Sequence, residues 1–197
     1  MKTYPIISGD IVTSQPIYAF DKLDGSNIRA EWSAKKGFYK FGTRKRLLDR
    51  NEPILGPAVD LVLEKYADDL AKVFKKQRQR KAICFFEFHG PNSFAGYHDK
   101  DDEHIVTLFD ANFQKGILEP KEFLKLFGHL DTPAMLFHGK VGPAFIKEVN
   151  AGELEGMTYE GVVCKGKNIS PGLPLMFKIK NHSWYAKLKA SKGDTNV

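Results

Sequence analysis

The stretch Lys22-Leu-Asp-Gly-Ser-Asn-Ile-Arg29 decides the fold of this 197-residue chain. Extended backbone alternates its faces, so Lys22 and Asp24 are expected to point the same way. Gly25 lets the backbone turn tightly or approach a ligand closely, as only glycine does at low cost. A Lys-x-Asp-Gly tetrapeptide occurs by chance in about one ordinary chain of this size in twenty. Its meaning therefore depends on the residues around it.

Hydrophobic periodicity predicts the elements on either side of this stretch. Alternation predicts a strand over Tyr18–Lys22, followed by a two-stranded meander over Ile28–Trp32 and Gly37–Phe41. Apolar residues at intervals of three and four predict an amphipathic helix from Gly56 to Gln79, and its buried face is expected to hold Val59, Val62, Tyr66, Leu70 and Val73. Further strands are expected over 83–88, 106–111, 134–141, 159–165 and 175–180, with short helices over 120–127 and 143–149.

Composition narrows the classes of function. The 30 basic and 24 acidic residues give a net charge of +6 and a pI near 9.1, which favours a polyanionic partner such as a nucleotide or nucleic acid. Cys84 and Cys164 lie apart in apolar runs, which excludes a disulfide framework and fits a reducing setting. The six histidines lack metal-ligand spacing, so no structural zinc is expected. No apolar run is long enough to span a bilayer, and we expect a cytoplasmic protein without a membrane partner.

Several charged residues allow an ordinary and a functional explanation. Glu87 stands in a strand of apolar neighbours, where a carboxylate needs partners, and a structural salt bridge would provide them. The basic run Gly42–Arg46 is equally consistent with a solvated turn and with a loop that faces phosphate. Lys178 and Lys180 share one strand face. Either this face is exposed to water, or a bound anion lies between the two ammonium groups. The acidic, histidine-containing segment 89–103 is better explained as an exposed loop than as a metal site.

The order of these motifs resembles the covalent nucleotidyltransferases, a superfamily of ATP-dependent DNA ligases, RNA ligases and mRNA capping enzymes. The matching positions span the chain from Lys22 to Lys180 and are Lys22, Asp24, Gly25, Arg29, Arg44, Glu87, Phe109, Glu160, Lys178 and Lys180. The resemblance implies an α+β, ATP-grasp-like adenylation domain, in which antiparallel sheets flanked by helices hold the nucleotide pocket between them.

The resemblance also implies a role for each matching position. Lys22 would attack the α-phosphate of ATP and retain AMP, because a neutral lysine amine is a nucleophile. Lys178 and Lys180 would stabilise the charge on that phosphate, and Glu160 would hold Mg²⁺, with Mn²⁺ as an alternative. The remaining positions would bind the nucleotide. Asp24 and Gly25 would do so next to Lys22, and Glu87 would accept from a ribose hydroxyl. Phe109 would stack on adenine, and Arg29 or Arg44 would meet sugar or phosphate.

The form Lys-Leu-Asp-Gly-Ser-Asn and the short chain resemble the branch of RNA ligases that seals nicks in duplex RNA. We expect a single domain over 1–197 without a C-terminal OB or helical domain, acting on RNA with a 5′-phosphate and a 3′-hydroxyl. Substrate recognition would then come from the domain's own basic surface or from a separate protein. The alternatives are a compact DNA ligase and a noncatalytic module that binds nucleic-acid ends.

Overall fold

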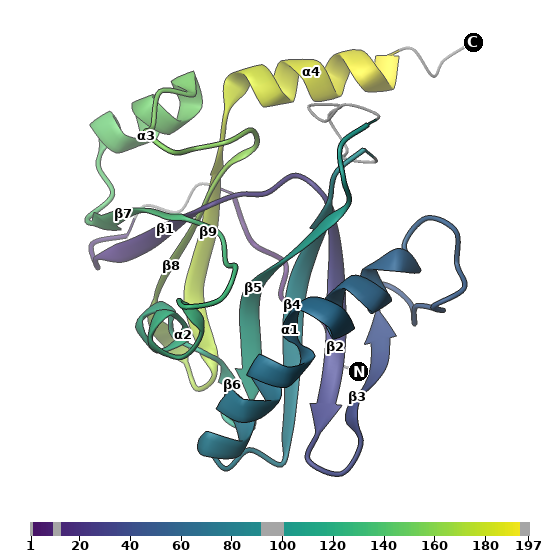
Figure 1. Ribbon diagram of the computed structural model, residues 1–197. Coiled ribbons are helices and arrows are strands. Elements are labelled where there is room, and N and C mark those ends of the chain that lie inside the picture. Colours follow the sequence, from purple (N-terminus) through teal and green to yellow (C-terminus); the bar gives the residue numbers. More distant parts are fainter. Residues whose placement is uncertain (1, 10–12, 92–100, 194–197) are drawn as a thin grey trace.

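The computed structural model of the chain describes residues 2–9, 13–91 and 101–193, and these residues form two antiparallel sheets and four helices (Figure 1). The four-stranded sheet has the order β7 (Met135–Gly139), β1 (Ile17–Asp21), β8 (Gly161–Ser170) and β9 (Leu173–Lys180). The five-stranded sheet has the order β3 (Gly37–Gly42), β2 (Ser26–Ser33), β4 (Lys81–His89), β5 (Ile105–Phe113) and β6 (Gly116–Ile117). The helices are α1 (Pro57–Lys76), α2 (Pro120–Phe127), α3 (Pro143–Ala151) and α4 (His182–Gly193). The predicted α+β class with antiparallel sheets and flanking helices is confirmed.

Helix α1 lies across one face of the five-stranded sheet (Figure 1). Alternate residues of β2, such as Ile28 and Trp32, pack with the buried side of the helix in the largest hydrophobic cluster. Val73, which was expected on that side, packs against the cluster but is only partly buried, whereas Phe74, which the prediction omitted, is fully buried. Phe74 continues the four-residue spacing from Leu70, and its ring contacts Trp32.

The four-stranded sheet buries one face against α3. Phe177 and Ile179 of β9 join Phe145 and Val149 of α3 in a second cluster. The predicted alternation along β9 is confirmed, because Phe177 and Ile179 are buried on one side while Lys178 lies on the other.

The two sheets meet through the faces that these helices leave uncovered. A third cluster contains Phe85 from the five-stranded sheet, Met176 from the four-stranded sheet and Tyr4 from the N-terminal segment. The N-terminal segment is tied to β9, where the Lys178 backbone N–H donates to the Ser8 carbonyl at 3.2 Å. The side chains of β2, β4, β8 and β9 that face this interface therefore come close together, although they are far apart in sequence.

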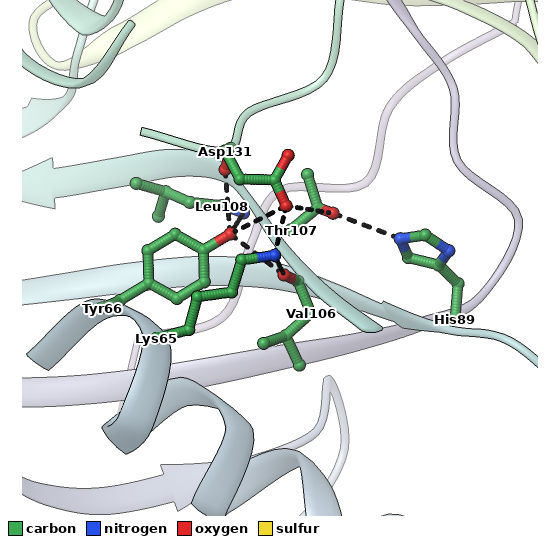
Figure 2. A network of polar contacts seen from close by, with 7 residues as sticks. All are labelled: Lys65, Tyr66, His89, Val106, Thr107, Leu108 and Asp131. Atoms are coloured by element: carbon green, nitrogen blue, oxygen red, sulfur yellow. Dashed lines mark hydrogen bonds and ion pairs between the residues drawn. The ribbon is translucent and has the colours of Figure 1, made fainter. Parts of the chain in front are cut away.

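A polar network fixes α1 and the loop after α2 to the edge of β5 (Figure 2). The Tyr66 hydroxyl bonds to the Val106 carbonyl at 3.0 Å and to the Asp131 carbonyl at 2.9 Å, and it accepts from the Leu108 backbone N–H at 3.3 Å. Lys65 forms an ion pair of 2.5 Å with the Asp131 carboxylate. This network holds the start of a loop that continues through Pro133, a cavity-lining residue, to Ala134, whose carbonyl accepts from the Asp21 N–H at 2.8 Å.

Removal of the Tyr66 hydroxyl is expected to destabilise the fold. Tyr66→Phe leaves buried backbone groups with fewer partners, which costs about 1–2 kcal/mol. Urea unfolding measures the loss. Tyr39→Phe is the matched control, since the Tyr39 hydroxyl bonds Glu31 at 2.8 Å on an exposed strand, and we expect a change below about 0.5 kcal/mol. Equal stability of the two variants would contradict the role given to this network.

Several predicted boundaries differ from the structure. Strand β1 ends at Asp21, so Lys22 lies just beyond the strand that was expected to contain it. Helix α4 was not predicted, and neither was the short strand β6. The predicted loop over 89–103 lies in part outside the described residues, since 92–100 are not described. No helix in the described part of the chain is both long and apolar enough to cross a membrane.

Candidate active site

A cavity of about 760 Å³ lies between the two sheets. Eight of the ten residues that the sequence singled out line it: Lys22, Asp24, Gly25, Arg44, Glu87, Phe109, Glu160 and Lys178. They come from both sheets and from the connections between strands, so the fold itself brings them together. The other two, Arg29 and Lys180, are not lining residues, although the Lys180 ammonium contacts the lining residue Glu160.

Hydrogen bonds of Lys22 and of its neighbour Asp21 hold the end of β1 at the cavity. The Lys22 N–H donates to the Gly161 carbonyl at 2.9 Å. The preceding carboxylate, Asp21, accepts from the Thr158 N–H at 3.0 Å and from its hydroxyl at 2.7 Å. Burial raises the pKa of Asp21, and the two bonds from Thr158 oppose that rise. Asp21 thereby fixes the loop that leads to Glu160.

The Glu160 carboxylate bridges two lysines. One oxygen lies 2.6 Å from Lys22 Nζ and the other lies 2.6 Å from Lys180 Nζ. Gly161 has a φ of 128°, and a Cβ there would collide with the Ile179 carbonyl, so glycine is required beside Glu160. Because Gly161 pairs with Lys180 across β8 and β9, the backbone sets Glu160 next to the lysine strand.

Gly25 makes a close backbone approach to the end of β4, while the predicted approach to a ligand stays a prediction. A Cβ at this position would collide with the Phe88 carbonyl and would lie 2.9 Å from the His89 Cβ. Glycine therefore lets the motif pass against the end of β4, directly beyond Glu87. Asp24, which precedes it, is buried at the cavity wall.

Glu87 and Lys178 carry perturbed charges. Burial raises the pKa of Glu87 to about 7, with nearby Glu160 and Asp24 adding to the rise and Lys22 and Arg44 opposing it. Burial also lowers the pKa of Lys178, and the positive charges of Lys180 and Lys22 lower it further. A cavity in which a carboxyl and an ammonium are both shifted toward neutrality is typical of a functional site.

A buried ion pair, which the sequence analysis did not predict, supports the cavity wall at Phe109. Lys165 Nζ lies 3.0 Å from the Asp110 carboxylate and donates to the Phe109 carbonyl at 2.8 Å. The Tyr4 hydroxyl donates to the same carboxylate at 2.8 Å, and its ring meets Phe109 edge-on at 5.0 Å. Phe109 is thus held rigidly from behind, with its ring at the cavity.

The two predicted arginines have different surroundings. Arg44 is on the exposed loop after β3 and lines the cavity together with Lys45 and Arg46, while Arg46 also forms a bidentate pair with Glu52 at 2.5 and 2.6 Å. Arg29 is buried, its pKa is lowered by that burial, and it donates to the Lys2 carbonyl at 3.4 Å. In the structure Arg29 therefore contacts the N-terminal segment.

The cavity fits a metal ion that takes few ligands from the protein and most of them from water or a bound ligand. Among the described residues, no group of three His, Cys, Asp or Glu side chains could hold an ion. Glu160 alone offers a carboxylate between two phosphate-attracting lysines. This donor set suits Mg²⁺ or Mn²⁺, because such ions keep several waters and take one or two carboxylates plus phosphate oxygens.

Comparisons with known proteins identify the fold. No protein-family model and no curated protein matches the chain. Solved structures of an RNA ligase from Naegleria gruberi do match. A mutant with ATP and manganese gives a TM-score of 0.65 at 14% identity, covering 89% of this chain and 52% of that chain. The ligase with pyrophosphate gives 0.64 at 15% identity over the same shares. A mutant in the apo state gives 0.64 at 14%, covering 94% and 59%.

The chain therefore shares the fold of these RNA ligase structures. It spans between about half and three-fifths of their length. At this identity the likeness concerns the fold alone.

Sequence reasoning missed four residues that shape the cavity: Tyr4, Asp21, Lys165 and Trp184. A signal existed for Trp184, because Asn181 is a favourable helix cap just before it. The partners of Tyr4 and Lys165 meet only in three dimensions, so no local pattern could have identified them.

Proposed function

We propose that this chain is the nucleotidyltransferase domain of an ATP-dependent RNA ligase. The observation that carries the proposal is the meeting of Lys22, Glu160 and Lys178 at one cavity between the sheets. A nucleophile, a carboxylate and a phosphate-binding cation are the groups that adenylyl transfer requires. The fold likeness to RNA ligases supports this class of reaction.

In the first step the Lys22 amine attacks the α-phosphorus of ATP. The new N–P bond replaces the bond to the β-phosphate oxygen, pyrophosphate leaves, and the protons of the lysine pass to water. Lys178 and Lys180 stabilise the negative charge that develops on the phosphate. The Lys22 ammonium must first give up a proton, because only the neutral amine has a free electron pair.

Glu160 would be the protein ligand of a bound Mg²⁺ or Mn²⁺, which would supply charge neutralisation at the phosphates. The other cavity residues orient ATP. Phe109 offers a rigid ring for adenine, Glu87 accepts from a ribose hydroxyl, and Arg44 binds phosphate. In the next two steps AMP passes to the 5′-phosphate of an RNA end, and the adjacent 3′-hydroxyl displaces AMP to form the phosphodiester bond.

The elevated pKa of Glu87 makes ATP binding dependent on pH. The ionised carboxylate is a far stronger acceptor for the ribose hydroxyl than the protonated one, so with a pKa of about 7 the affinity rises by up to about tenfold between about pH 6 and 8. Titration calorimetry at each pH measures it. Glu87→Gln, which cannot ionise, controls for the titration of ATP itself and should remove this rise. A wild-type rise no larger than that of the variant would contradict the role of Glu87.

The same shift has the opposite effect on stability. The folded pKa of about 7 lies above the ordinary value of 4.5, so the folded state keeps a proton that the unfolded chain loses. This contribution is fully present below about pH 4.5 and is lost as the pH rises through about 7.

A nick-sealing assay tests the proposed function. Duplexes with one 5′-phosphate, 3′-hydroxyl nick are prepared with all-RNA, hybrid and all-DNA strands and incubated with ATP and Mg²⁺ or Mn²⁺. We expect the fastest sealing where RNA supplies the 3′-hydroxyl end. Faster sealing of all-DNA would make the chain a DNA ligase. Binding of ends without any sealing or AMP transfer would make it a noncatalytic module.

A further inference from the structure

Helix α4 begins immediately after the lysine strand and brings an aromatic residue back to the site. The Asn181 side chain accepts from the Ser183 N–H at 2.9 Å, and its carbonyl accepts from the Tyr185 N–H at 3.2 Å. This cap starts the helix at the strand end and sets Trp184 in its first turn. Trp184 is only 3% exposed and lines the cavity, whereas its neighbour Tyr185 is 43% exposed.

The indole ring of Trp184 lies against Lys180. The Lys180 ammonium is 3.7 Å from the centre of the Trp184 ring and 5.2 Å from the centre of the Tyr185 ring. A cation at the shorter distance over tryptophan, shielded from water, makes one of the stronger cation–π contacts. On its other side Lys180 lies 2.6 Å from Glu160, so the ammonium is held between a carboxylate and a ring.

The contact acts through the ring face. Trp184 Nε1 is buried and has no hydrogen-bond partner among the described residues. The indole N–H therefore adds no bond that would hold the side chain in place. A phenyl ring keeps a π face but has no N–H, and a leucine keeps apolar volume without a π face. These substitutions separate the possible contributions of the residue.

We propose that Trp184 is a positioning residue that fixes the Lys180 ammonium on Glu160. A lysine ammonium on its flexible stem would otherwise sample many orientations. If Lys180 turned away, the Glu160 oxygen that does not meet Lys22 would lose its partner, and the site would lose a cation placed for the phosphate charge. The proposal rests on the proposed function for its catalytic consequence, but the contact itself can be tested independently.

Other charged groups also face the Lys22–Glu160 pair. They are Lys178 and Lys180 from β9, Glu87 from β4, Asp24 from the segment after β1, and Arg44 from the loop after β3. None of them changes when Trp184 is substituted. A loss of rate that Trp184→Leu shows and Trp184→Phe does not would therefore report on how Lys180 is placed.

The first experiment measures single-turnover formation of the lysyl-AMP adduct at saturating ATP. Trp184→Phe is expected to stay within about threefold of wild type, because a π face remains. Trp184→Leu is expected to be at least about tenfold slower, because the Lys180 ammonium is no longer held. Lys189→Ala, at an exposed position on the same helix, is the matched control and should equal wild type. A Trp184→Leu rate like wild type, or a Trp184→Phe variant as slow as Trp184→Leu, would overturn the proposal.

The second experiment needs no catalysis. A double-mutant cycle combines Trp184→Leu with Lys180→Met and follows thermal unfolding. A coupling between the two positions is expected, because each substitution removes the same contact. Strictly additive effects would overturn the contact. If wild type formed no lysyl-AMP, the proposed function would fail, while this cycle would still decide whether Trp184 holds Lys180.

Discussion

Lys22→Ala is expected to abolish formation of the covalent AMP adduct and, with it, all sealing that starts from ATP. In the proposed reaction the Lys22 amine forms the bond to phosphorus, and we expect no other described group at the site to replace it. Lys178 and Lys180 face the same site but are held by β9, with Lys180 locked on Glu160. ATP binding is expected to persist in Lys22→Ala, since the cavity keeps its other lining residues.

This separation of binding from chemistry makes the experiment informative. Adduct formation is followed with labelled ATP in a denaturing gel, and ATP binding is measured on the same preparation. Lys167→Ala is the matched control, because Lys167 is exposed on β8 and does not line the cavity. An adduct that survives in Lys22→Ala would assign the nucleophile to another residue.

Glu160→Gln is expected to have the second largest effect, and the effect should separate affinity from rate. The substitution keeps the shape of the side chain but removes the negative charge that lies 2.6 Å from both Lys22 and Lys180. Without that charge the site is more positive, so metal-free ATP should bind at least as tightly as in wild type. Adduct formation should nevertheless be about 10²- to 10³-fold slower, because the metal ligand is lost.

Single-turnover kinetics at saturating ATP, with a parallel affinity measurement, tests this split. Glu155→Gln is the matched control, since Glu155 is an exposed carboxylate in the segment before β8. Weaker ATP binding together with an unchanged rate would place Glu160 among nucleotide-binding groups and would remove its role at the metal.

The comparison of sequence and structure shows what local pattern can predict. Alternation along β9 correctly separated Phe177 and Ile179 from Lys178, because a strand has a fixed period of two. The helical period identified α1, but it could not choose between Val73 and Phe74 at the edge of the buried stripe. Helix α4 was overlooked because its mixed Lys and aromatic composition has little amphipathic pattern, although its Asn181 cap was visible.

Contacts between residues that are far apart in sequence could not be predicted from local sequence patterns. The order of motifs indicated which residues belong to one site, and the structure brings Lys22, Glu87, Glu160 and Lys178 to one cavity. Their catalytic and binding roles stay predictions. The sequence could not reveal that Glu160 joins Lys22 to Lys180, or that Asp110 pairs with Lys165 behind Phe109, because these contacts depend on how the two sheets pack together.

The central claim is that Lys22 becomes covalently adenylylated. Intact-mass spectrometry of the protein after incubation with ATP and Mg²⁺ or Mn²⁺, followed by peptide mapping, tests it most directly. We predict a mass increase of one AMP moiety, located on Lys22 and reversed by added pyrophosphate. An unchanged mass in folded protein that binds ATP, or an AMP moiety on another residue, would contradict the account.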